Sequence, residues 1–130
     1  MSEHPNAARA REGFERFIAG DPEGLLALFA PHAVWHVSGA NAMAGDYTGL
    51  DEILAFLRRT REITDGTYQV ELLWVVADDE HVVPLYRARG RRGERTLDIE
   101  QALFIRVEDG LWVDVRAQPL DQAAFDAFWG

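Results

Sequence analysis

Residues 96–107 read TLDIEQALFIRV, and this stretch alternates between two kinds of side chain along almost its whole length. One series is apolar apart from Gln101, and the other is mostly polar or charged. Successive side chains of a β-strand point to opposite faces of a sheet, so the alternation predicts a long strand with one face toward a core. The inward series is Leu97, Ile99, Gln101, Leu103, Ile105 and Val107.

Three further segments with a two-residue period surround this strand in the sequence. They cover residues 67–76, 82–89 and 111–118, and short polar turns separate them, such as Glu108-Asp109-Gly110. Short turns of this kind join neighbouring antiparallel strands. The second half of the chain therefore predicts a four-stranded antiparallel meander.

The first half of the chain favours helices. Apolar side chains recur at helical spacing between Pro5 and Gly20, and Asp21 is a typical N-cap for a second helix that ends at Pro31. Residues 50–61 form a third amphipathic pattern. Helices followed by strands indicate the α+β class, with three N-terminal helices packed against a mainly antiparallel sheet.

Two short segments lie between the second and third helices. Residues 33–37 read AVWHV and predict a short strand, whereas residues 38–48 contain several turn-forming side chains and predict a loop. A last short amphipathic segment carries Phe125, Phe128 and Trp129.

Composition excludes several classes of function. The 130 residues, of which 48% are hydrophobic, suit one domain over residues 1–130. With 13 Lys and Arg against 22 Asp and Glu, the formal charge of −9 argues against nucleic-acid binding and against docking on an anionic membrane. The absence of cysteine excludes disulfides, thiolate zinc sites and a Cys nucleophile. Without a signal peptide or a long apolar run, a soluble cytoplasmic protein is expected.

Five short motifs, in this order and spacing, resemble the SnoaL-like branch of the nuclear-transport-factor-2-like superfamily. They are AGDPEG (19–24), LFA (28–30), VWHV (34–37), GDYTG (45–49) and DAFW (126–129). The resemblance implies a cone-shaped α+β barrel, in which a curved sheet wraps the helices and leaves a pocket at the wide end. It also implies a homodimer through the outer sheet face. Activities in the family include ketosteroid isomerase, polyketide cyclase, dehydratase and epoxide hydrolase, and some members only bind, so the fold does not give the function.

Steroid isomerase chemistry can be tested against the sequence. It needs an Asp base, with a Tyr and a protonated acid as oxyanion donors. Aligned on the motifs, these positions fall on Val37, Gly13 and Leu103, none of which can move a proton or donate a side-chain hydrogen bond. The sequence therefore argues against this activity.

His36 is the candidate catalytic residue, because imidazole titrates near neutral pH. Inside the cone, it would have a lowered pKa and could act as a base with Tyr47 or Gln101. The alternative follows from strand alternation, which places Trp35 and Val37 inward and His36 outward. It would then be structural and would titrate near 6.5.

Five side chains are candidates for ligand binding: Trp35, Tyr47, Trp74, Tyr86 and Gln101. The aromatic residues would give a pocket flat walls, and the alternative for each is plain core packing. Gln101 would orient a polar group of the ligand, or else would pair with a helix end or a water.

The outer sheet face is expected to carry Asp98, Glu100, Asp114 and Arg116 as cross-strand pairs or dimer contacts. Phe104 and Trp112 alternate outward among them and would supply apolar area for the homodimer. No metal or other cofactor is expected, because the four histidines are scattered and lack the spacing of a zinc motif.

The sequence as a whole favours a protein that binds a small apolar molecule in a pocket at the open end of the cone, and that could act as a polyketide cyclase or isomerase. The alternative is a protein-interaction module with a filled cone and no catalysis, which would expose an apolar patch. The inward aromatic residues favour the ligand, and the lack of an inward carboxylate pair argues against catalysis.

Overall fold

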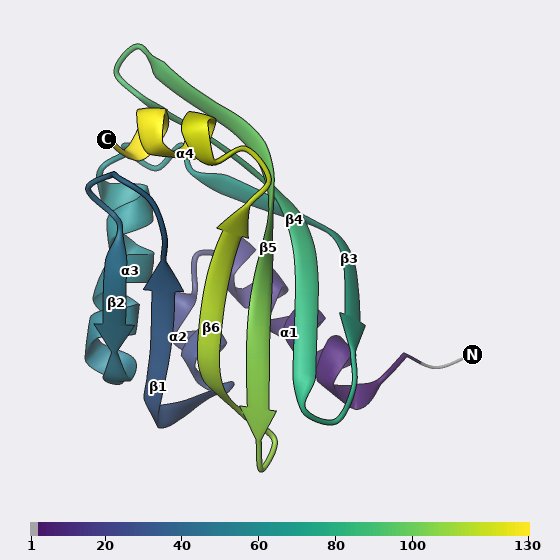
Figure 1. Cartoon of the computed structure of the whole chain (residues 1–130). Coiled ribbons are helices and arrows are strands. Elements are labelled where there is room, and N and C mark those ends of the chain that lie inside the picture. Colours follow the sequence, from purple (N-terminus) through teal and green to yellow (C-terminus); the bar gives the residue numbers. More distant parts are fainter. Residues whose placement is uncertain (1–2) are drawn as a thin grey trace.

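The computed structural model describes residues 3–130 as one curved sheet with four helices (Figure 1). The helices are α1 (Pro5–Ile18), α2 (Pro22–Leu26), α3 (Gly49–Glu62) and α4 (Gln122–Trp129). The strands are β1 (Phe29–Val37), β2 (Gly45–Thr48), β3 (Gln69–Ala77), β4 (His81–Arg92), β5 (Arg95–Glu108) and β6 (Leu111–Pro119).

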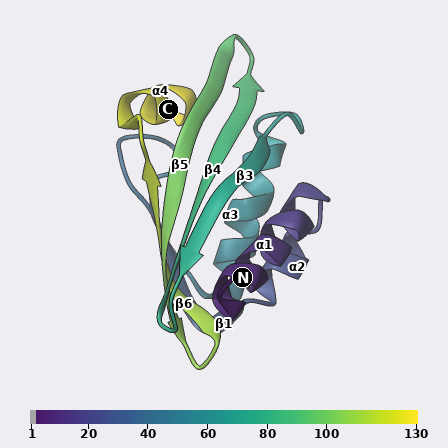
Figure 2. The same cartoon turned by 90° about the vertical axis from the view of Figure 1, so that its right-hand side faces the viewer.

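The six strands are arranged in the order β2-β1-β6-β5-β4-β3, and only β1 and β6 pair in parallel. The sheet does not close, because β2 and β3 remain as edges. The three helices α1 to α3 lie together on one side of the sheet, and α4 lies near the projecting β4–β5 hairpin (Figure 2). The predicted α+β cone is confirmed.

The helix boundaries follow the predicted capping residues in part. The Asp21 side chain accepts a hydrogen bond from the Gly24 N–H at 3.0 Å and so caps α2. Gly20 has the positive φ of 85° that lets the chain turn between α1 and α2. However, α2 ends at Leu26 instead of Pro31, because the chain enters β1 at Phe29.

Strand β2 corrects the prediction of a loop over residues 38–48. Its four residues pair antiparallel with β1, where Tyr47 lies opposite Trp35 and Asp46 opposite His36. The strand is short, lies at the sheet edge and is held by a partner about ten residues away. Periodicity within so short a segment carries little information.

A bulge in β3 overturns the prediction that Trp74 faces inward. Leu72 pairs with Tyr86, whereas Trp74 already pairs with Leu85, so β3 contains one extra residue at this point. An extra residue sends every later side chain of the strand to the opposite face. Trp74 is therefore 45% exposed on the outer face, and Val75 is buried instead.

A second bulge overturns the prediction that Trp112 faces outward. Arg106 pairs with Asp114 and Val107 with Trp112, which leaves Val113 as the extra residue of β6. Trp112 consequently turns into the core and is only 2% exposed. Phe104 has no such shift and is exposed as predicted.

No helix within residues 3–130 is long and apolar enough to cross a membrane.

Candidate functional site

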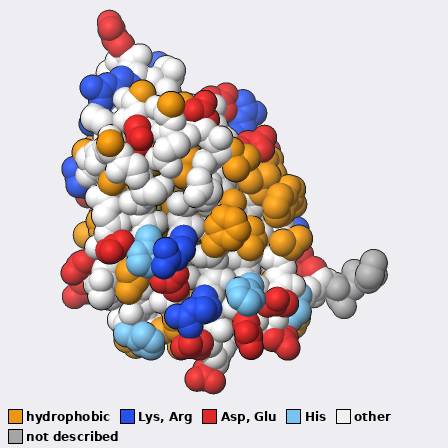
Figure 3. Space-filling model, in the orientation of Figure 1, with side chains coloured by type: hydrophobic (Ala, Val, Ile, Leu, Met, Phe, Trp, Pro, Cys, Tyr) orange, Lys and Arg blue, Asp and Glu red, His pale blue; other side chains and the backbone are white. Residues whose placement is uncertain are grey.

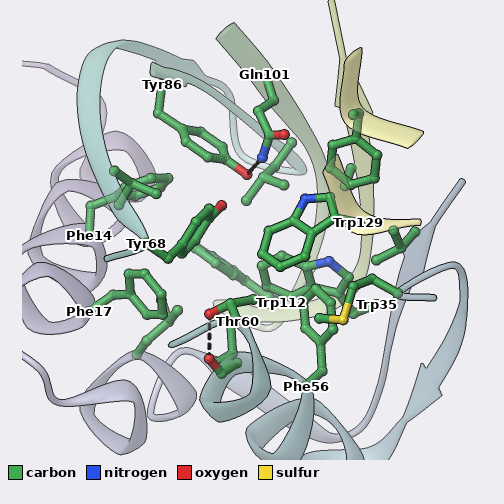
Figure 4. A pocket seen from close by; sticks show the side chains of 18 residues that line it. Phe14, Phe17, Trp35, Phe56, Thr60, Tyr68, Tyr86, Gln101, Trp112 and Trp129 are labelled. Carbon is green, nitrogen blue, oxygen red and sulfur yellow. Dashed lines mark hydrogen bonds between the residues drawn. The ribbon is translucent and has the colours of Figure 1, made fainter. Parts of the chain in front are cut away.

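The interior of the cone contains a cavity of about 60 Å³ that is partly open to solvent. Its walls come from the inner sheet face, from α1 and α3, and from the last turns of α4 (Figure 4). The lining residues are Phe14, Phe17, Leu25, Trp35, Val37, Met43, Phe56, Leu57, Thr60, Tyr68, Val70, Tyr86, Gln101, Leu103, Trp112, Ala117, Phe125 and Trp129.

Aromatic rings form much of this wall. The ring of Tyr86 lies 5.1 Å from that of Phe14, and the ring of Tyr68 lies 5.5 Å from that of Trp129, as measured between centroids. Trp35 packs at 5.5 Å from Phe56. Such tilted and edge-to-face pairs are a favoured packing of aromatic groups and hold the walls in place.

The helix α4 closes one side of the cavity with Phe125 and Trp129. Its position is fixed by polar contacts to two other segments of the chain. The Asp126 carboxylate accepts hydrogen bonds from Asn41 at 2.7 Å and from the Ala40 N–H at 3.2 Å, and Arg92 donates to the Phe128 carbonyl at 2.7 Å. The C-terminal helix is thus tied both to the β1–β2 loop and to strand β4.

A small polar group interrupts the apolar wall. Gln101 Nε2 donates a hydrogen bond to the Tyr86 hydroxyl at 2.7 Å, whereas Gln101 Oε1 is buried without a partner among the described residues. Trp35 Nε1 is a second buried polar atom in the wall without a partner there. A buried polar atom without a partner costs about 1–3 kcal/mol, so each atom favours a bound water or ligand.

The two tyrosines of the cavity are neutral at ordinary pH. Burial raises the pKa of Tyr86 to about 12, although the hydrogen bond from Gln101 offsets part of the effect. Burial also raises the pKa of Tyr68 well above its ordinary value, with a further contribution from nearby Tyr86. Both phenols can therefore donate hydrogen bonds, but neither supplies a base.

The structure places three of the five predicted ligand-binding residues in the cavity wall: Trp35, Tyr86 and Gln101. Trp74 lies outside it because of the β3 bulge. Tyr47 supports the wall from behind, since its ring packs 4.5 Å from that of Phe56 and its hydroxyl donates to the Met43 carbonyl at 2.6 Å.

Sequence reasoning missed several aromatic residues of the cavity. Tyr68 had an inward position in the predicted strand, and that position was the available signal. Trp129 belongs to the predicted C-terminal amphipathic segment, but nothing local shows that this segment returns to the cone. Trp112 was placed on the wrong face by its bulge.

His36 lies on the outer sheet face and does not line the cavity. Its Nδ1 is 2.7 Å from Asp46 Oδ1, and its Nε2 is 2.7 Å from Asp114 Oδ1. Arg116 continues this cluster with a contact of 3.3 Å to the second oxygen of Asp114. The structure supports the alternative in which His36 faces outward. His36 therefore cannot serve as a base inside the cavity.

The pKa of His36 also differs from both sequence expectations. Burial lowers it, but the hydrogen bonds and charges of Asp46 and Asp114 outweigh this effect and raise the pKa above its ordinary value. A ring with a carboxylate at each nitrogen is stabilised in its protonated form, in which both nitrogens donate.

This environment predicts a pH dependence of stability. A raised pKa in the folded state adds stability below about pH 6.5, the unfolded value, and that stability is lost as pH rises through the folded value. Urea unfolding should therefore show the native protein losing stability relative to His36→Asn as the pH rises above about 6.5. Parallel pH profiles of the two proteins would contradict this assignment.

Comparison with known proteins assigns this chain to a family. The sequence profile of the SnoaL-like domain matches residues 10–115. The chain belongs to the SnoaL-like domain family. An uncharacterized protein of Mycobacterium tuberculosis is 32% identical over 130 residues, which cover 99% of each chain.

Solved structures agree with this SnoaL-like assignment. Bal32a, from a soil-derived mobile gene cassette, is 33% identical with a TM-score of 0.91 and 96% of each chain covered. TerC, co-crystallized with polyporic acid, has a TM-score of 0.79 over 96% of this chain and 98% of its own. TerC is only 19% identical, so this likeness concerns the fold alone.

The described lining of this SnoaL-like cavity offers no side chain for acid-base catalysis near pH 7. Within residues 3–130, the lining contains no Asp, Glu, His, Lys or Arg. Val37 and Leu103, which occupy the positions aligned with two acids of steroid isomerases, do line the cavity. The wall can therefore hold and orient a neutral molecule, but it supplies no side chain that takes a proton near pH 7.

Proposed function

We propose that this SnoaL-like protein binds a small, largely apolar molecule in the cavity between the sheet and helices α1 and α3. The observation that carries the proposal is the side-chain oxygen of Gln101, a residue that is 4% exposed in an aromatic cavity and whose oxygen has no partner among residues 3–130. Buried amide oxygens nearly always have a hydrogen-bond partner, and here that partner must come from outside the described residues. A bound molecule would supply that partner.

Binding accounts for the site better than acid-base catalysis does. A cyclase or isomerase with a general base needs a side chain of suitable pKa within reach of the substrate. His36 lies on the outer face, and the phenols of Tyr68 and Tyr86 hold their protons near neutral pH. The proposed role is therefore that of a binding protein.

The tryptophans provide a direct test of ligand binding. Trp35, Trp112 and Trp129 line the cavity, whereas Trp74 lies on the outer face. Titration with acetophenone should move the NMR signals of the first three indole N–H groups and leave that of Trp74 unchanged. No movement up to the solubility limit of acetophenone would remove the proposal.

Filling the cavity should abolish this binding. Ala117 lines the cavity and is half-buried, so Ala117→Phe places a ring in the space and costs roughly 1–3 kcal/mol of stability. The variant should remain folded and fail to bind acetophenone in calorimetry. The matched control Ala127→Phe alters an exposed position of α4 and should bind normally. Equal affinity in both variants would place the ligand elsewhere.

We also propose that the outer sheet face forms a homodimer. The exposed apolar side chains there are Trp74 and Val76 on β3 and Phe104 on β5. Figure 3 shows hydrophobic side chains gathered over this part of the sheet, with charges of both signs beside them. Such a patch with a polar border is typical of a protein-protein contact, and it also suits the alternative of another protein partner.

Light scattering at micromolar concentration should give the mass of a dimer. Phe104→Asp combined with Trp74→Glu should give a monomer, because both changes place charges in the apolar patch. Ile18→Asp, at an exposed position at the end of α1, is the matched control and should remain dimeric. A monomeric native protein would contradict the dimer and leave the patch for a different partner.

A further inference from the structure

We infer that the cavity selects a neutral ring compound with two oxygen functions: a carbonyl oxygen that faces the hydroxyls of Tyr68 and Tyr86, and a hydroxyl that faces Gln101 Oε1. This inference rests on the proposed ligand-binding function and adds the polar chemistry of the ligand to it. Some polar atoms of the wall are already paired within the chain, and others have no partner among residues 3–130.

The Gln101 amide determines the direction of hydrogen bonding at one end of the cavity. Its Nε2 donates to the Tyr86 oxygen at 2.7 Å, so that oxygen already accepts a hydrogen bond. The Tyr86 proton has no acceptor among residues 3–130. A phenol in this arrangement can satisfy its proton only with an acceptor from outside the chain, such as a carbonyl oxygen.

Tyr68 adds a second donor at the same end. Its hydroxyl points toward the Tyr86 hydroxyl and the Gln101 amide (Figure 4), and its ring is 8% exposed. Burial is the main cause of its raised pKa, which nearby Tyr86 raises further and the Gln101 amide lowers. Two neutral phenols directed at one region resemble the donor pairs that bind a carbonyl oxygen in other proteins.

Gln101 Oε1 requires the opposite chemistry. This oxygen is a buried acceptor with no donor from the described residues. An amide oxygen can be satisfied by a hydroxyl or N–H group, but not by a carbonyl or an ether. The ligand therefore needs a donor as well as an acceptor, and the hydroxyl is the simplest group that provides one.

The remaining wall explains why the ligand is neutral and cyclic. The lining carries no formal charge, so an ionised ligand would lose its hydration without gaining a counter-charge. Trp35, Phe56 and Trp129 offer flat apolar surfaces that suit a ring. Trp35 Nε1 is a further unpaired donor, which favours a second acceptor atom on the ligand.

Four one-ring probes separate these contributions: ethylbenzene, acetophenone, meta-hydroxyacetophenone and meta-methoxyacetophenone. Each hydrogen bond that is gained should tighten binding about three- to tenfold. Calorimetry should therefore give a dissociation constant that falls from ethylbenzene to acetophenone and again to meta-hydroxyacetophenone. The methoxy compound should lose the second gain, because it cannot donate.

Matched variants assign each gain to its side chain. Gln101→Leu should remove the preference for hydroxyl over methoxy and retain binding of ethylbenzene. Tyr68→Phe combined with Tyr86→Phe should remove the preference for acetophenone over ethylbenzene. If Gln101→Leu unfolds because Tyr86 loses its partner, the double variant Gln101→Leu/Tyr86→Phe replaces both members of the pair and restores a foldable test.

The possible outcomes separate failure of this inference from failure of the proposed ligand-binding function. If all four probes bind with equal affinity, the cavity binds ligands but does not discriminate between them by their oxygen atoms, and the inference is overturned. If acetophenone binds as tightly as its hydroxyl derivative, the Gln101 amide presents its N–H groups to the cavity instead of its oxygen, which also overturns it. If no probe binds, the proposed function itself fails.

Discussion

Replacing Trp112 by alanine should lower the free energy of unfolding by about 3–5 kcal/mol, as expected for a large aromatic residue removed from a core. The indole is 2% exposed and its ring packs 5.1 Å from that of Phe29. Its backbone N–H also donates to the Leu28 carbonyl at 2.8 Å, which joins β6 to the chain entering β1. Truncation leaves this backbone bond but empties the space beside the cavity.

The matched control is Trp74→Ala, which removes the same side chain from the outer face. Because Trp74 is 45% exposed, its loss should cost about 1 kcal/mol or less in the monomer. Urea unfolding of both variants measures the difference, at a protein concentration low enough for light scattering to show monomers. Alternation without bulges predicts the reverse order, so a larger effect at Trp74 would show that the bulged registers of β3 and β6 are wrong.

Replacing Phe128 by alanine should also cost about 3–5 kcal/mol. Phe128 is 1% exposed and its ring packs 4.8 Å from that of Trp129. On its other side it approaches Gly90, where an added Cβ would lie only 3.4 Å from the phenyl ring. The C-terminal helix therefore belongs to the main core, although it follows the region that the family profile matches.

Leu120→Ala is the control for this prediction. Leu120 precedes α4 and is 62% exposed, so its truncation should change the stability by about 0.5 kcal/mol or less. Phe128→Ala should in addition weaken acetophenone binding, because Trp129 would lose its neighbour in the cavity wall. A stable Phe128→Ala variant with normal binding would mean that α4 is peripheral to the cavity.

The wall of this SnoaL-like protein differs from an acid-base site in a specific way. Its polar side-chain groups are an amide, two phenols, indoles and the Thr60 hydroxyl, which already donates to the Leu57 carbonyl. The titratable cluster of His36, Asp46 and Asp114 lies on the other face of the sheet. The fold thus separates the groups that could bind a neutral ligand from those that respond to pH. Changes at His36 should affect stability more than ligand affinity.

The amino-acid sequence by itself determined the fold class and much of the local structure. The two-residue period of residues 96–107 predicted β5, and its single polar inward residue, Gln101, lies in the cavity wall. Asp21 predicted the start of α2. These features are local, because a cap or a strand face depends on residues a few positions apart, and short-range chemistry decides them.

The tertiary structure alone decided which aromatic residues form the cavity. The extra residues Leu73 and Val113 reverse the faces of Trp74 and Trp112, and a bulge is set by the pairing with a neighbouring strand. His36 shows the same dependence. Alternation could suggest its face, but its raised pKa comes from Asp46 together with Asp114, which is 78 residues away in the sequence. Contacts between distant segments have no local signal, so only the folded chain could bring Trp129 to the cavity and leave Gln101 Oε1 without a partner among residues 3–130.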